Sequence, residues 1–187
     1  LIVGGAAYRE YSKAQELAAA QQLGDQITAA LELESDTAQA EALAAVSAQN
    51  AGGRAVLAML EAGALAKADD ITGAVAQLEN VATDAELPLI YRHIASFKAL
   101  VLQGDSLSTD ERRLQYEALA QPGAPLALLA GEQLALLDIE EGKADAAIDR
   151  LRVIAADAGV SADLKERATQ VIVALGGSAE AAVTTEG

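Results

Sequence analysis

Apolar residues recur every three or four positions over most of the chain, which is the spacing of one face of an α-helix. The first such segment extends from about Ala6 to Glu34, and Gly24-Asp25 interrupts its pattern, which predicts a bend or a tight turn. Ser35-Asp36-Thr37 supplies capping oxygens for a second helix over residues 38–47. The run Asn50-Ala51-Gly52-Gly53 is then expected to break the chain.

Beyond this break the helical pattern repeats itself. The opening positions of the repeats, Arg54, Pro88, Pro125 and Ser161, are 34, 37 and 36 residues apart. Proline suits the first turn of a helix and glycine the position after its end, and both mark these segments. The helices expected here cover residues 54–67, 71–82, 88–103, a segment after the caps at 108–110, 125–142, 144–156 and 161–175. A period near 34 is typical of tetratricopeptide repeats, so we predict an all-α, tetratricopeptide-like right-handed solenoid of antiparallel helix pairs.

Composition supports helices that pack closely. Apolar residues make up 52% of the 187 residues but aromatic residues only 3%, so alanine carries much of the core. There is no cysteine, which excludes thiolate zinc sites, thiol catalysis and disulfide bonds.

The net negative charge of the chain limits the classes of molecule that it can bind. The formal net charge is -15, and the 13 basic residues are scattered singly. Nucleic-acid binding depends on clustered Lys and Arg that displace counterions from phosphates, so we expect no nucleic-acid partner. The same charge would repel anionic lipid from the folded body.

The start of the chain is apolar and then turns polar. Leu1 to Ala7 are small or apolar, Tyr8 and Tyr11 follow, and Arg9 lies between them, which is the order found where a membrane span leaves the bilayer. The alternative is a hydrophobic first turn of a soluble helix. We therefore expect residues 1–23 to be the end of a membrane anchor and a connecting helix. Residues 24–177 would then form the tetratricopeptide-like domain, and residues 178–187 a disordered tail.

The residues that could carry chemistry are few. His93 is the single histidine; Ser96 is near it in sequence, but no carboxylate on that face would orient its ring. The acidic pairs Asp69-Asp70, Asp110-Glu111 and Glu140-Glu141 fall at helix ends, where they cap or accompany a helix dipole. We expect no catalytic, cofactor-binding or metal-binding residues.

Binding residues are expected on the first helix of each pair, because that helix lines the concave face of such solenoids. Tyr91, Arg92, Phe97 and Lys98 form the densest aromatic and basic cluster of the chain. The predicted concave face is mostly apolar, with two isolated charges, and would accept a hydrophobic or amphipathic helix. Its candidate residues are Val56, Met59, Tyr91, Ile94, Lys98, Leu129, Glu132 and Leu136.

The region from Gly24 to about Asp157 resembles the tetratricopeptide-like domain of the ancillary Sec-translocon subunit family, the YfgM-like proteins. The resemblance rests on the segments GDQITAAL at 24–31, RAVLAMLEA at 54–62 and GAVAQL at 73–78, and on the two helices that begin at proline and end at glycine. It implies a single-pass inner-membrane protein with this domain in the periplasm. It also implies a non-catalytic scaffold whose partners are the translocon or another envelope complex, exported proteins or chaperones.

Three alternatives stay open. One is a coordinator of envelope assembly or cell division with the same domain type. Another is a soluble tetratricopeptide adaptor, although such domains usually clamp a carboxylate with several Lys and Arg, and this groove is expected to be acidic and aliphatic. The third is an enzyme that uses His93, which the loss of activity in His93→Ala would reveal.

Overall fold

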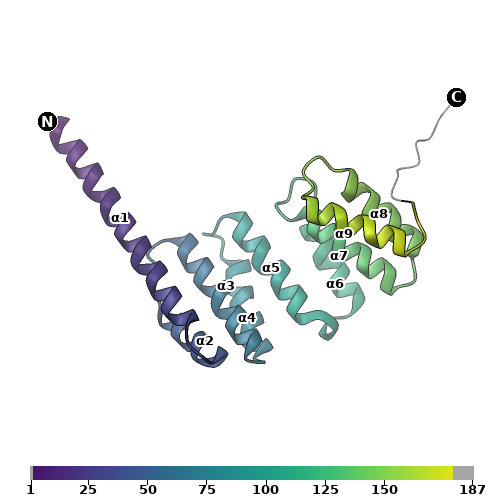
Figure 1. Ribbon diagram of the computed structural model, residues 1–187, viewed down its shortest axis with the longest axis horizontal. Coiled ribbons are helices and arrows are strands. Elements are labelled where there is room, and N and C mark those ends of the chain that lie inside the picture. Colours follow the sequence, from purple (N-terminus) through teal and green to yellow (C-terminus); the bar gives the residue numbers. More distant parts are fainter. Residues whose placement is uncertain (1, 179–187) are drawn as a thin grey trace. The chain divides into compact units, whose positions relative to one another are not determined.

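The computed structural model describes residues 2–178, and the side chains of residues 9–104 and 106–178. Over this part of the chain every regular element is a helix and no strand is present, which confirms the all-α prediction (Figure 1). The α-helices are α1 (Ile2–Leu31), α2 (Asp36–Ala45), α3 (Ala51–Lys67), α4 (Ile71–Thr83), α5 (Leu89–Gln103), α6 (Thr109–Leu119), α7 (Ala127–Glu140), α8 (Ala144–Ala156) and α9 (Ala162–Ala174); Gly104–Ser106 form a 3-10 turn.

Side-chain caps set several helix starts where the sequence predicts them. The Ser35 hydroxyl accepts a hydrogen bond from the backbone of Ala38 over 3.1 Å, and Ser161 caps α9 in the same way. Ser108 and Glu111 form a complete capping box at the start of α6. Asp70 caps α4, after a turn in which Asp69 has a positive φ of 63°.

Helix α2 begins and ends two residues before the expected 38–47, and three further expectations about helix breaks and starts are wrong. Helix α1 passes through Gly24 without a bend, and the Thr28 hydroxyl donates a 2.9 Å hydrogen bond to the Gly24 carbonyl there. Gly52 and Gly53 do not break the chain but lie in the first turn of α3, which Asn50 caps by accepting from the backbone N–H of Gly53. Helix α7 begins two residues after Pro125, because its first turn is preceded by a non-helical turn.

The chain forms two compact units, Leu1–Gln103 and Gly104–Gly187. The division predicted from the sequence, into an anchor end and connecting helix (1–23), a tetratricopeptide-like domain (24–177) and a tail (178–187), stays a prediction. In the first unit, α2, α3, α4 and α5 each pack on the next. Its core is built mainly from alanine and leucine: Ala62, Ala74, Leu78 and Ala95 are fully buried where α3, α4 and α5 meet.

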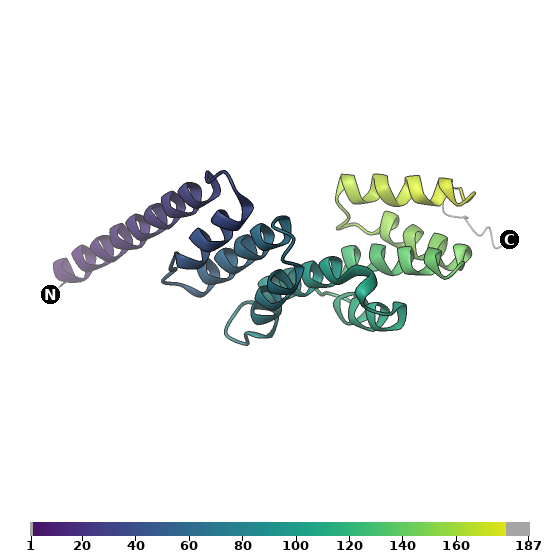
Figure 2. The same cartoon turned by 90° about the horizontal axis from the view of Figure 1, so that it is seen from below.

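Helix α1 joins this unit only through its last turns. Leu23, Ile27 and Ala30 pack beside α2 and α3 in a second alanine-leucine cluster. Residues 9–22 are exposed apart from the half-buried Ser12, so this stretch makes few contacts within the unit, and α1 projects beyond α2 to α5 (Figures 1 and 2). The expectation about Leu1 to Ala7 lies outside the described side chains. No helix among the described residues is long and apolar enough to cross a membrane.

The second unit packs α6, α7, α8 and α9 in sequence order. Ala135, Ala147, Leu151 and Ile172 are central to its core. Helix α9 buries Leu164, Ala168 and Ile172 and exposes Lys165, Glu166 and Gln170 on its outer face.

Candidate protein-binding surfaces

In the first unit, the candidate residues Val56 and Met59 on α3 and Tyr91, Ile94 and Lys98 on α5 lie on two helices that contact each other. The close approach occurs where a Cβ atom on Gly52 would lie 3.3 Å from the hydroxyl oxygen of Tyr91. Glycine at position 52 therefore lets the tyrosine ring lie against the first turn of α3.

These five side chains differ in accessibility. Val56 is 37% exposed and Lys98 is exposed, so both are open to a partner. Met59 and Tyr91 are half-buried and pack against the core of α3, α4 and α5, and Ile94 is also half-buried. Substitution of Met59 or Tyr91 would therefore change the stability of the unit as well as any surface, which makes Val56 and Lys98 the better probes.

The second unit contributes the other three candidates, all on α7. Leu136 is 43% exposed and Leu129 packs partly buried against the core. Glu132 is not the isolated charge that we predicted, because its carboxylate accepts two hydrogen bonds of 2.8 Å from Arg167 of α9. These bonds also raise the pKa of Arg167. This ion pair could not be predicted from local sequence, because Glu132 and Arg167 are 35 residues apart.

A polar network of the second unit centres on Asp138, which sequence reasoning missed. Asp138 is only 2% exposed, and its carboxylate bonds to Arg113 of α6 at 2.8 Å and to Arg150 of α8 at 3.0 Å. Its position four residues after Leu134 and three after Ala135 places a carboxylate on the buried stripe of α7, and that is the signal that could have found it.

The acidic pair Glu140-Glu141 belongs to the same end of α7. A hydrogen bond from Arg112 lowers the pKa of Glu140, and one from Lys143 lowers the pKa of Glu141. The N···O distances of both bonds are 2.7 Å. A carboxylate at the C-terminal end of a helix interacts unfavourably with the negative end of the helix dipole. The positive charges of Arg112 and Lys143 offset this repulsion. The network explains these residues as structural.

His93 lies half-buried on α5, and its Nδ1 atom is buried without a hydrogen-bond partner in the described part of the chain. Among the described residues no three His, Cys, Asp or Glu side chains come together in a way that could hold a metal ion.

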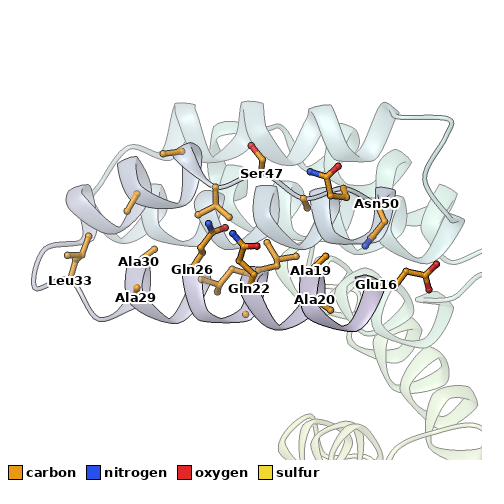
Figure 3. A pocket seen from close by; sticks show the side chains of 18 residues that line it. Glu16, Ala19, Ala20, Gln22, Gln26, Ala29, Ala30, Leu33, Ser47 and Asn50 are labelled. Carbon is orange, nitrogen blue, oxygen red and sulfur yellow. The ribbon is translucent and has the colours of Figure 1, made fainter. Parts of the chain in front are cut away.

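A groove lies between α1 and the segment formed by α2 and residues 46–50 (Figure 3). Its volume is about 1210 Å³, and seven of its eighteen lining residues are alanine. Gln22 and Gln26 of α1 extend toward the opposite wall, which carries Ser47 and Asn50 (Figure 3). We call this feature the α1–α2 groove.

Comparison of the chain with family models, with curated proteins and with solved structures finds no match.

Proposed function

We propose that this chain is a non-catalytic, protein-binding scaffold of tetratricopeptide-like helix pairs, held at the inner membrane with its helical domain in the periplasm. In this proposal it serves the translocon or another envelope complex, or the proteins that leave it, as the resemblance to ancillary Sec-translocon subunits implies. The first helices of the pairs, α3, α5 and α7, carry the surface that binds partners.

The observation that supports this proposal most is contact between first helices of successive pairs. In the first unit α3 touches α5 at Gly52 and Tyr91, and in the second unit α7 is tied to α9 through Glu132 and Arg167. The helices α3, α5, α7 and α9 begin 38, 38 and 35 residues apart. Helical repeats stack their first helices side by side in this way, so within each unit the first helices offer a shared surface for binding.

The exposed part of α1 supports the tethered arrangement. A stretch that makes few contacts in its own unit but remains helical suits a connector between a membrane anchor and a folded domain.

A photo-crosslinking amino acid at Val56 or Lys98 tests the binding surface in envelope preparations of a Gram-negative host. Crosslinks to one defined envelope protein are expected from both positions. Ala76, an exposed residue of the second helix α4, is the matched control position and should give none. Crosslinks from Ala76 alone would refute binding through the first helices.

Location needs its own test. Alkaline phosphatase fused after Gly187 of the full-length protein folds into an active enzyme only in the periplasm, where its disulfides form. Activity in whole cells and sedimentation with the inner membrane are expected. An inactive fusion in the soluble fraction would instead favour the soluble adaptor.

A further inference from the structure

The α1–α2 groove has the dimensions of a docking site for a helix. A helix with its side chains is about 10–12 Å wide and rises about 5.4 Å per turn, so about 1210 Å³ accommodates roughly two to three turns. Alanine is the commonest lining residue, and the larger apolar groups of the walls are Leu23, Ile27, Leu33 and Val46. Small side chains let a second helix approach closely, and the amides of Gln22 and Gln26 offer hydrogen bonds.

The charge of the segment that forms the groove is entirely negative. Between Lys13 and Arg54 the chain has no basic residue. Its six carboxylates in that interval are Glu16, Asp25, Glu32, Glu34, Asp36 and Glu41. All except the half-buried Asp36 are exposed, and Glu16 itself lines the groove. The other five carboxylates lie outside the lining of the groove but on the same segment. An occupant that carries positive charge would be attracted to this segment, and one that carries negative charge repelled.

We propose that the α1–α2 groove binds a basic amphipathic helix of a partner protein, with the apolar stripe of that helix against the apolar side chains of the walls and its Lys or Arg residues toward Glu16 and the other carboxylates of the segment. A second copy of the chain is a poor occupant, because it brings the same six carboxylates. Residues 179–187 are equally unsuited, since they contain Glu180 and Glu186 and no basic residue. This groove is separate from the predicted concave face, and the inference does not depend on that face.

The test uses a fluorescein-labelled synthetic helix of roughly 18 residues, made of Leu, Ala and Lys with apolar residues at every third or fourth position. Two control peptides have Glu in place of every Lys, or the same composition in scrambled order. Fluorescence anisotropy with the full chain should show binding of the first peptide alone, and this binding should weaken as salt is raised.

Two matched variants locate the binding. Ala20→Trp fills the groove from an exposed lining position, whereas Ala18→Trp adds the same side chain at an exposed position of α1 outside it. The first should weaken binding on the order of tenfold, about 1.4 kcal/mol, and the second should leave it unchanged. The double variant Glu16→Lys and Glu41→Lys should weaken binding and flatten the salt dependence. Circular dichroism confirms that each variant is folded.

Several outcomes would overturn the inference. Equal binding of the scrambled peptide would mean unspecific charge attraction, and equal effects of the two tryptophans would place the peptide elsewhere. Sedimentation velocity that shows a dimer which Ala20→Trp dissociates would make a second copy the occupant. Loss of peptide binding in Val56→Glu with Lys98→Glu, but not in Ala20→Trp, would move the site to the predicted concave face and leave the proposed function intact.

Discussion

Arg113 and Asp138 meet at the centre of the second unit, where an arginine Nη2 atom lies 2.8 Å from the aspartate Oδ1 atom. Arg150 bonds the other oxygen of the same carboxylate at 3.0 Å, so Asp138 joins α6, α7 and α8. A buried carboxylate is tolerated only when its partners satisfy it. Its removal takes the ionic partner from Arg150 and leaves Arg113 with Glu141 alone, whose Oε2 atom lies 2.9 Å from the Arg113 Nη2 atom.

We therefore expect Asp138→Ala to lower the free energy of unfolding of the second unit by about 2–3 kcal/mol. Asp138→Asn should lower it less, because the amide keeps the shape and one acceptor. Urea titration followed by circular dichroism measures both, with Asp149→Ala as a control because the Asp149 side chain is 78% exposed. Equal stability of Asp138→Ala and the control would show that the network contributes little.

Stability should also fall in acid because of Glu140 and Glu141. The pKa of each is lowered from its ordinary value of 4.5, since Arg112 and Lys143 respectively hold the charged forms. A carboxyl with a lower pKa in the folded chain binds its proton more readily in the unfolded chain. The stability that it gives is complete above pH 4.5 and is lost as the pH falls through the lowered pKa.

The melting temperature, measured between pH 7 and pH 3, should fall over this interval. The double variant Glu140→Gln and Glu141→Gln should melt lower than the wild type at pH 7 and show a shallower fall in acid. Glu117→Gln, which changes an exposed carboxylate of α6, is the control. A double variant with the pH profile of the wild type would rule out these two residues as a source of the acid sensitivity.

Two glycines inside helices should respond to alanine in opposite ways. A Cβ atom at Gly24 would meet nothing within 4 Å, so Gly24→Ala should raise stability by about 0.5–1 kcal/mol through helix propensity. A Cβ atom at Gly53 would lie 2.8 Å from the Cβ atom of Ala48 and 3.3 Å from Leu23, so Gly53→Ala should destabilise the first unit by about 1–2 kcal/mol. Thermal melts of the two variants decide this, and a stabilised Gly53→Ala would contradict the tight packing of α3 on α1.

These glycines also show which parts of the fold could be predicted. Caps such as Ser108 and Ser161 act within their own turn, so local sequence is enough to place the starts of α6 and α9. The local sequence around Gly24 and Gly53 does not distinguish them from the glycines that end helices elsewhere in the chain. Glycine is required at position 53 because Ala48 and Leu23 leave no room for a Cβ atom, and Leu23 is far away in sequence.

The candidate binding residues could likewise be predicted only as far as local sequence determines their positions. Periodicity is enough to choose Val56 and Lys98 as exposed positions on first helices, and the structure leaves both accessible. It is not enough to show that Glu132 is bonded to Arg167, because that pairing depends on how α7 and α9 meet. The α1–α2 groove escaped notice because no residue in it has distinctive chemistry, and only the packing of α1 against α2 creates it.

The unbroken course of α1 has a mechanical consequence. Thirty residues in one helix extend about 45 Å, and such a rod transmits rotation about its axis instead of absorbing it at a hinge. Tyr11 and Gln22 are eleven positions apart, which is close to three full turns, so their azimuths differ by only about 20°. A contact that fixes the orientation of the helix about its axis at Tyr11 therefore also fixes the direction in which the groove at Gln22 opens. Insertion of two residues between them would swing that direction by about 200° and point the groove away from its partner.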